Sequence, residues 1–277
     1  MIAYNYKNKN LILSNIEFFD LHQTLDCGQA FRWSKTGENS YSGIAFGRRL
    51  DLEMSKNKLI LKNVSSDEYE KIWKNYFDFG RDYKKLHELF SKHGEKLKAA
   101  ITFAPGIRLL QQEPWETLIS FILSQNANIP RIKKMLSALC ENFGDALPCG
   151  GFAFPTPEKL ASLTVNDLKP INAGYRAGYI LDAATRVYDG RINFTEISQI
   201  TSDDAQKKLL EIRGVGTKVA ECVLLFGLGR VERVPMDVWM KRVMENHYSS
   251  GFPAELQQYA GIAQQFLFHH ERTKIKE

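Results

Sequence analysis

The sequence predicts an α+β fold in which an N-terminal antiparallel β-sheet packs on a mainly α-helical region that contains a helix-hairpin-helix. Two observations support this fold. Short apolar runs separated by Gly, Asn, Ser and Lys fill residues 10–64, whereas apolar residues follow helical spacing from Asp67 onward. We therefore expect a sheet domain with helices over residues 1–100 and a helical region with the functional cleft over residues 101–277.

The individual elements follow from local patterns. Short apolar runs predict strands at residues 11–13, 30–33, 42–46 and 59–61. The apolar positions Tyr69, Ile72, Trp73 and Tyr76 predict a helix, and Leu86, Leu89, Phe90 and Leu97 continue the helical spacing. After an interruption at Pro105-Gly106, the pattern predicts helices at residues 114–123, 129–143, 157–163, 175–187, 202–212, 217–227, 237–248 and 254–270.

Composition limits the class of protein. The chain has 277 residues with 44% hydrophobic content, which is enough for a real core, and its net charge of +5 permits binding to a polyanion without demonstrating it. The four cysteines, Cys27, Cys140, Cys149 and Cys222, have neither metal-ligand spacing nor a secreted disulfide pattern. Without a signal peptide or a twenty-residue apolar run, we expect a cytoplasmic monomer that does not enter membranes.

The segment Leu209–Ala220 is typical of a phosphate-binding hairpin. Gly214 and Gly216 allow a tight turn between two helices and leave backbone N–H groups bare at the start of the second helix, where the dipole favours an anion. We expect the amides of Gly216 and Val219 to hold a DNA phosphate. Taken alone, the glycine pair is equally consistent with a plain turn between helices.

Two residues near this hairpin have the properties of a catalytic pair. Lys218 lies in the first turn of an otherwise apolar helix, a setting that favours a neutral, nucleophilic amine. Asp237 follows Pro235 and precedes an amphipathic run, so it also fits the simpler role of a helix N-cap. Capping and catalysis are compatible, because a cap fixes a carboxylate where a loop meets a helix.

Together these features resemble the DNA glycosylase superfamily named after its helix-hairpin-helix, its Gly/Pro-rich loop and its aspartate. The string Gly-Val-Gly-Thr-Lys-Val-Ala-Glu-Cys at residues 214–222 is similar to the 8-oxoguanine DNA glycosylase branch. The resemblance implies a base excision repair enzyme that flips 8-oxoguanine out of double-stranded DNA, preferably opposite cytosine. It implies a Schiff base on Lys218, strand cleavage by β-elimination, and Asp237 opposite the positive charge that develops on the deoxyribose.

The resemblance also assigns residues to the cytosine left behind. Asn126 would fill the gap in the duplex, while Arg131, Tyr175 and Arg176 would contact the cytosine; Asn128 is placed with these DNA-binding residues. The alternatives are ordinary: a helix cap for either asparagine, a core aromatic for Tyr175 and a solvated charge for Arg176. The three consecutive asparagines common in the family are interrupted here at position 127, which is Ala.

Recognition of the damaged base is expected from both ends of the chain. The carbonyl of Gly28 would accept a hydrogen bond from N7–H, a proton that guanine lacks, although a bend before a strand would also explain this glycine. Gln264 would read the Watson–Crick edge, and Phe268, four residues later on the same helical face, would stack on the base. Cys222 would cover its other face, unless it is an inert core thiol. Phe121 is placed with this group.

No small-molecule cofactor is expected. The resemblance allows a cation held by the backbone carbonyls of Leu210, Ile212 and Val215, and it excludes an iron-sulfur cluster because residues 271–277 contain no cysteine. Two other functions are compatible with parts of this pattern. An alkylated-purine glycosylase would use water and the aspartate alone, against which Lys218 argues. A non-catalytic helix-hairpin-helix module would not need Lys218, Asp237 and Phe268 together.

Overall fold

The computed structural model describes residues 2–274, which fold into two compact units. The first unit combines residues 2–43, 50–111 and 231–274, and the second combines residues 44–49 and 112–230. This division differs from the predicted boundary at residue 100, because the chain returns to the first unit after residue 230. Helical periodicity predicts that the last helices form, but it carries no signal for the unit on which they pack.

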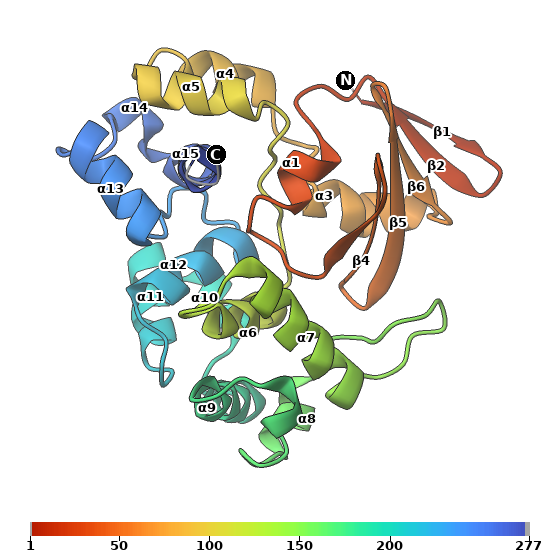
Figure 1. Cartoon of the computed structure of the whole chain (residues 1–277), viewed down its shortest axis with the longest axis vertical. Coiled ribbons are helices and arrows are strands. Elements are labelled where there is room, and N and C mark those ends of the chain that lie inside the picture. The colour runs from red at the N-terminus through yellow and green to blue at the C-terminus, as the bar shows by residue number, and fades with distance from the viewer. Residues whose placement is uncertain (1, 275–277) are drawn as a thin grey trace. The chain divides into compact units, whose positions relative to one another are not determined.

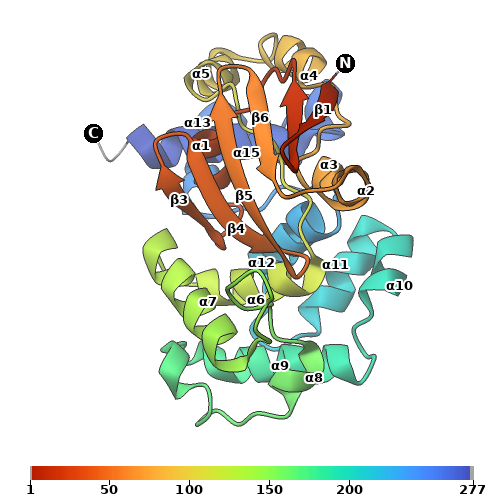
Figure 2. The same ribbon diagram turned by 90° about the vertical axis from the view of Figure 1, so that its right-hand side faces the viewer.

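The chain forms a six-stranded antiparallel sheet, which belongs to the first unit except for residues 44–49 (Figure 2). Its strands lie in the order β1-β2-β6-β5-β4-β3 and are β1 (Ala3–Lys7), β2 (Asn10–Ser14), β3 (Trp33–Gly37), β4 (Ser40–Ala45), β5 (Arg48–Ser55) and β6 (Lys58–Lys62). The runs at residues 11–13, 42–46 and 59–61 were predicted. The strand expected at residues 30–33 is wrong except for Trp33. Neither β1 nor β5 was predicted, although β5 buries the alternate residues Leu50 and Leu52; all five residues of β1 are exposed.

Aromatic residues fill the core beside the sheet. The segment after β6 forms α2 (Ser66–Glu68), the π-helical turn η1 (Tyr69–Trp73) and α3 (Lys74–Tyr76). The indole Nε1 of Trp33 donates to the hydroxyl of Tyr76 at 2.7 Å, and the rings of Trp33, Trp73 and Tyr76 also meet Phe77. Each of these rings is at most 2% exposed, so together they bury a large apolar area that fixes the helical segment on the sheet.

The remaining helices of the first unit include the C-terminal ones (Figure 1). The helix α15 packs on both α5 and α13, and the amide of Gly261 at its start donates to the carbonyl of Val231 at 2.8 Å. These contacts place the end of the chain in the same unit as the sheet. The helices are α1 (Leu21–Leu25), α4 (Tyr83–Phe90), α5 (Glu95–Phe103), α13 (Val238–His247), α14 (Ala254–Gln257) and α15 (Ala260–Lys274).

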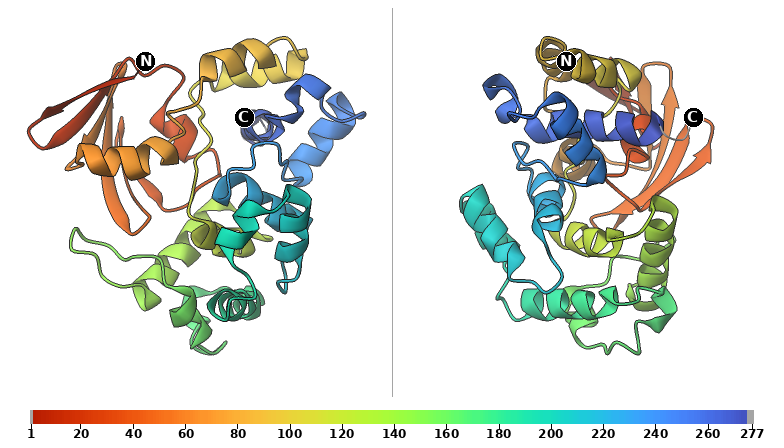
Figure 3. Two further views of the ribbon diagram at one scale, coloured as in Figure 1. Left: turned by 180° about the vertical axis from the view of Figure 1, so that it is seen from behind. Right: turned by 60° about the vertical axis from the view of Figure 1, so that its left-hand side comes forward.

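The second unit is helical (Figure 3). Its helices are α6 (Pro114–Ser124), α7 (Ile129–Phe143), α8 (Pro157–Ala161), η2 (Lys169–Ile171), α9 (Arg176–Tyr188), α10 (Phe194–Gln199), α11 (Ser202–Leu210), α12 (Thr217–Cys222) and the π-helical η3 (Val223–Gly227). Of these, α10 and η2 were not predicted. The apolar α6 packs against α12 and η3, which makes it the central helix around which the hairpin is built. None of the helices in residues 2–274 has the length and apolar character needed to cross a membrane.

Candidate functional site

The predicted hairpin is present between α11 and α12. Gly214 has a φ of +80°, and a Cβ at this position would come within 2.2 Å of the ring of Tyr179, so only glycine fits. Gly216 is the N-cap of α12 and makes no side-chain cap bond, and nothing lies within 4 Å of the position a Cβ would take. A side chain at Gly216 would thus meet no neighbour, and without a side-chain cap the first amides of α12 are not used by a capping residue, as an anion-binding turn requires.

Lys218 lies in the first turn of α12, half-buried against α6. Its Nζ is 3.4 Å from the hydroxyl Oγ of Ser124 and 4.9 Å from the ring centroid of Phe121. Phe121 is 4% exposed and stacks on Phe226 with a centroid distance of 5.4 Å. The ammonium end is thus held at an aromatic face, with one hydroxyl as its polar contact. The sequence analysis placed Phe121 with the damaged base and did not single out Ser124.

The turn between α6 and α7 carries the residues expected to enter the DNA. Asn126 is exposed with a φ of +47°, a backbone conformation that asparagine tolerates well. Asn128 caps α7, accepting from the amide of Arg131 at 3.0 Å, so its alternative role as a cap is confirmed. The amide Nε2 of Gln125 donates to the carbonyl of Gly214 at 3.1 Å and ties this turn to the hairpin.

Arg176 has a structural role that the sequence analysis did not anticipate. It is only 2% exposed, and its guanidinium donates to the carbonyls of Gln125, Asn126 and Ala173. The interpretation of Arg176 as a solvated helix charge is therefore wrong. Because these bonds shape the turn that presents Asn126, Arg176 positions one of the predicted DNA-binding residues. Its own contact with the cytosine remains a prediction.

Tyr175 and Arg131 are accessible to a ligand. Tyr175 is 54% exposed, so it is not a core aromatic, and the guanidinium of Arg176 lies 4.7 Å from its ring centroid. Arg131 is exposed near the start of α7. Its side chain borders a pocket of about 340 Å³ together with Lys169 and Asn172. A base or phosphate approaching this surface would meet two cations and an amide.

Asp237 is the N-cap of α13, as the simpler interpretation requires. Its Oδ1 accepts from the amides of Trp239 at 3.0 Å and Met240 at 2.9 Å. Both bonds use the same oxygen, so Oδ2 keeps its lone pairs. The carboxylate is held rigidly by backbone groups while one oxygen stays available, which is the arrangement that electrostatic catalysis needs. Lys218 and Asp237 belong to different compact units.

Three predicted recognition residues belong to the first unit. Gly28 has a φ of +95° in the turn before β3, which confirms the bend. The neighbouring Gln29 is fully buried, and its Nε2 donates to the carbonyls of Thr24 and Arg108 at 2.9 and 2.8 Å. On α15, Gln264 is 4% exposed, and its Oε1 finds no hydrogen-bond partner within residues 2–274. A buried amide oxygen is costly to leave without a partner, so this oxygen can accept a hydrogen bond from a water or a ligand.

The remaining predicted site residues, Phe268, Cys222 and Val219, are buried or half-buried. Phe268 is half-buried on α15, one turn beyond Gln264. Cys222 is 1% exposed at the end of α12, in the second unit. Val219 is also buried, so its amide rather than its side chain is the group available to a phosphate. The unit containing Lys218 thus also carries Phe121 and Cys222, whereas Gly28, Gln264 and Phe268 share the other unit with Asp237.

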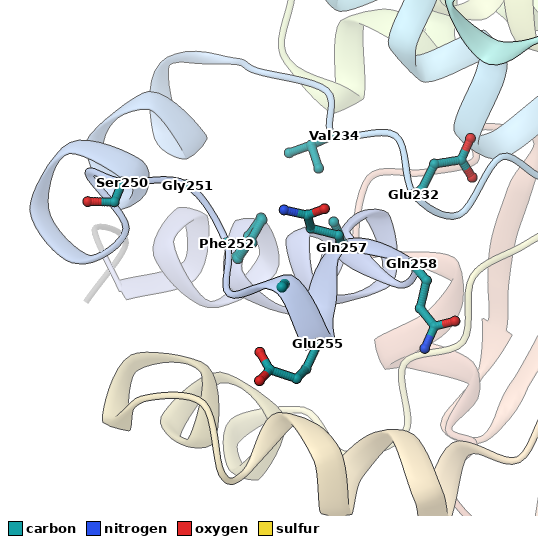
Figure 4. Close-up of a pocket in the computed structure, with 10 residues that line it drawn as sticks. Glu232, Val234, Ser250, Gly251, Phe252, Glu255, Gln257 and Gln258 are labelled. Carbon is teal, nitrogen blue, oxygen red and sulfur yellow. The ribbon is translucent and has the colours of Figure 1, made fainter.

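A further pocket, of about 930 Å³, opens in the first unit (Figure 4). None of the predicted site residues lines it. Its walls combine carboxylates and amides with a few apolar side chains, namely Glu232, Val234, Ser250, Gly251, Phe252, Ala254, Glu255, Gln257, Gln258 and Ala260. Metal-binding clusters are a separate question. Within residues 2–274, no group of three or more His, Cys, Asp or Glu side chains is arranged to hold a metal ion. The prediction that the chain has no iron-sulfur cluster used residues 271–277, of which residues 275–277 lie outside the described part of the chain.

Two family models match consecutive parts of the chain. Residues 11–118 match the model described as 8-oxoguanine DNA glycosylase, N-terminal domain, and residues 119–259 match the model described as HhH-GPD superfamily base excision DNA repair protein. A Saccharomyces cerevisiae protein named N-glycosylase/DNA lyase is 33% identical over 272 residues, which cover 88% of this chain and 72% of that protein. A Methanothermobacter thermautotrophicus protein named probable N-glycosylase/DNA lyase is 30% identical and covers 64% of this chain and 67% of that protein.

Solved structures resemble the chain over nearly its whole length. MBOgg1 in complex with a low affinity DNA ligand is 38% identical, covers 100% of both chains and has a TM-score of 0.93. The 8-oxoguanine glycosylase/lyase of Clostridium acetobutylicum, in complex with double-stranded DNA containing cytosine opposite 8-oxoG, is 33% identical with a TM-score of 0.92. That match covers 99% of this chain and 98% of the other.

Proposed function

The chain belongs to the 8-oxoguanine DNA glycosylase family of the HhH-GPD superfamily, and we propose that it excises 8-oxoguanine opposite cytosine through a Schiff base on Lys218. It is an enzyme of the bifunctional class, a DNA N-glycosylase that also cleaves abasic sites, and its substrate is damaged double-stranded DNA. The observation that carries the finer proposal is the environment of Lys218. Within the described residues its amine contacts an aromatic face and a hydroxyl and is in no ion pair with a carboxylate, so it can act as a nucleophile once it has lost its proton.

The proposed chemistry divides between the two residues. Expelling the base leaves oxocarbenium character at C1′ of the deoxyribose, which the Asp237 carboxylate stabilises electrostatically. The Lys218 amine then forms a bond to C1′; the C1′–O4′ bond breaks, O4′ takes up the proton that leaves the nitrogen, and an imine with the opened sugar results. The imine acidifies the C2′ hydrogens, so that removal of one of them expels the 3′ phosphate. The protein holds the amine and the carboxylate in place for these steps. Two backbone hydrogen bonds to Oδ1 fix the Asp237 carboxylate.

The hairpin supplies the grip on the backbone. The bare amides at the start of α12 bind a phosphate, and the same helical turn carries Lys218, so binding a phosphate also places the amine. A hairpin cation would use the carbonyl of Ile212, which already accepts from the amide of Val215 at 3.0 Å and keeps one lone pair. The cation, the absence of a required cofactor, the monomeric state and the cytoplasmic location remain proposals.

Selection of the lesion rests on Gly28, Gln264 and Phe268. The unsatisfied Oε1 of Gln264 would accept from the N1–H or amino group of the flipped base. The carbonyl of Gly28 would accept from N7–H, and an intact guanine would leave that carbonyl facing a lone pair. A mismatch of this kind costs about 1 to 3 kcal/mol. On the opposite strand, Arg131 and Tyr175 are the accessible residues for the cytosine.

One assay tests this proposal. Duplexes carrying 8-oxoguanine opposite each of the four bases, with an intact guanine duplex as control, are incubated with the protein and analysed for base release and strand cleavage. We expect the fastest release opposite cytosine, together with β-elimination products. Equal rates opposite all four bases would contradict the cytosine preference, and base release without strand cleavage would contradict the lysine mechanism.

A further inference from the structure

We infer that Arg272 is a positioning residue for lesion recognition, which locks the turn carrying Gly28 to the helix carrying Gln264 and Phe268. This inference rests on the proposed function of those three residues. Gly28 and α15 are far apart in the sequence, so their spacing must be set by tertiary contacts. The structure assigns that task to side chains of α15.

Arg272 contacts both sides of the recognition site. Its Nη2 donates to the backbone carbonyl of Asp26 at 2.9 Å, and its guanidinium carbon lies 5.7 Å from the ring centroid of Phe268. One planar cation therefore touches the turn that leads to Gly28 and the ring that would stack on the base. A guanidinium suits this dual contact because it donates hydrogen bonds in its plane and stacks through its face.

Gln265 provides a second tie to the same turn. It is 2% exposed, and its Nε2 donates to the carbonyl of Cys27 at 3.3 Å. The carbonyls of residues 26 and 27 are thus both held by side chains of α15. On the other side of the glycine, the buried Gln29 is bonded to Thr24 and Arg108. With its neighbours held on both sides, the Gly28 carbonyl has a fixed direction.

The turn itself is anchored by a buried thiol. Cys27 is fully buried, and its Sγ donates to the carbonyl of Thr24 at 3.1 Å. Burial raises the pKa of this thiol to about 11, so it stays protonated and keeps its donor at physiological pH. The consequence is a rigid recognition turn whose position relative to Phe268 depends on Arg272 and Gln265.

Arg272→Met tests the inference, because methionine keeps an unbranched apolar side chain but lacks the guanidinium group that makes both contacts. We expect single-turnover excision of 8-oxoguanine to fall about tenfold and lesion-duplex affinity to fall similarly, the usual scale for a misplaced recognition group. Lyase activity on a duplex with a preformed abasic site should stay within about twofold, since that reaction contains no base to recognise. Lys274→Met on the same helix removes one exposed charge and should change neither activity.

Two more measurements separate positioning from general stability. Arg272→Lys restores the charge without the planar fork and should recover less than half of the lost excision rate. In a double-mutant cycle, Arg272→Met combined with Phe268→Ala should lose less than the product of the two single effects, because Arg272 acts partly through that ring. If Arg272→Met does not fold, Gln265→Met is expected to give the same split between excision and lyase activity.

The outcomes distinguish the inference from the function on which it rests. If the wild-type protein excises 8-oxoguanine and Arg272→Met has the same excision rate, the inference is overturned but the proposed function is not. Parallel loss of excision and abasic-site lyase activity in Arg272→Met would also overturn it, as would independent effects in the cycle. Wild-type protein without activity on any 8-oxoguanine duplex would overturn the proposed function itself.

Discussion

Lys218 lies over the face of Phe121, with its Nζ 4.9 Å from the ring centroid. The ring is in turn stacked on Phe226, so an aromatic pair from α6 and η3 supports the amine. These contacts restrict where the long, flexible side chain places its amine, which suits the nucleophilic role that we propose for Lys218.

Lys218→Gln should abolish the covalent intermediate. Glutamine keeps most of the side-chain volume but cannot form an imine, so base release and strand cleavage should fall by roughly 10³-fold or more while lesion binding changes little. Borohydride added during turnover should trap a protein–DNA adduct only with Lys218 present. Lys207→Gln, on the neighbouring α11, is the matched control and should trap normally. An adduct that persists in Lys218→Gln would assign the chemistry to another amine.

Asp237→Asn should separate catalysis from capping. Asparagine is also a good N-cap and can accept the bonds from Trp239 and Met240, so the free energy of unfolding should change little. The charge opposite the forming oxocarbenium ion is lost, and excision should slow by about 10²- to 10³-fold. Asp237→Ala should lose the same activity and in addition about 1 kcal/mol of stability. Normal excision by Asp237→Asn would leave Asp237 with capping alone.

Some of this architecture was predictable because local chemistry specifies it. The helix α7 begins and ends as expected, since Asn128 caps it, Pro130 suits its first turn and its apolar face follows helical spacing. A turn between α11 and α12 was predictable from Gly214 and Gly216, and Gly214 indeed has a positive φ, which glycine adopts without steric cost. These signals lie within a few residues of the feature they specify.

Other features depend on contacts that do not require a particular type of residue as partner. Arg272 and Gln265 bond to backbone carbonyls, and any residue supplies a carbonyl, so neither tie could be found from the sequence. The same holds for Arg176, whose acceptors include two carbonyls of a distant turn. The return of residues 231–274 to the first unit is likewise set by packing of α15, which periodicity does not encode.

Arg131→Ala should relax the choice of opposite base more than it weakens binding. The exposed Arg131 can donate two hydrogen bonds to a cytosine, a contact worth about 1 to 3 kcal/mol of discrimination. The ratio of excision rates opposite cytosine and opposite adenine should therefore fall roughly tenfold or more. Lys134→Ala removes an exposed charge from the same helix and should leave the ratio unchanged. Equal loss on all four duplexes would mark Arg131 as a phosphate or structural residue.

Stability should fall as the pH is lowered, in part because of His87. Burial, and then the nearby charge of Arg108, lower the pKa of His87 to about 4 in the folded protein. Its ring lies 4.5 Å from the ring of Phe18 and 5.4 Å from that of Phe266. An imidazole with a lowered folded pKa binds its proton more readily in the unfolded chain. Its stabilising contribution is therefore complete above the unfolded value near 6.5 and is lost as pH falls toward 4.

His87→Phe isolates this contribution, because phenylalanine suits the aromatic surroundings and does not titrate. After discounting for solvent screening of a half-buried group, His87 should account for about 1 kcal/mol of the stability lost between pH 7 and pH 4.5. Urea unfolding at several pH values would measure the loss, which should be smaller in His87→Phe than in the wild type. His247→Phe, at an exposed position, is the control and should follow the wild type. Identical pH profiles for all three proteins would show that His87 does not contribute and that other groups cause the acid sensitivity.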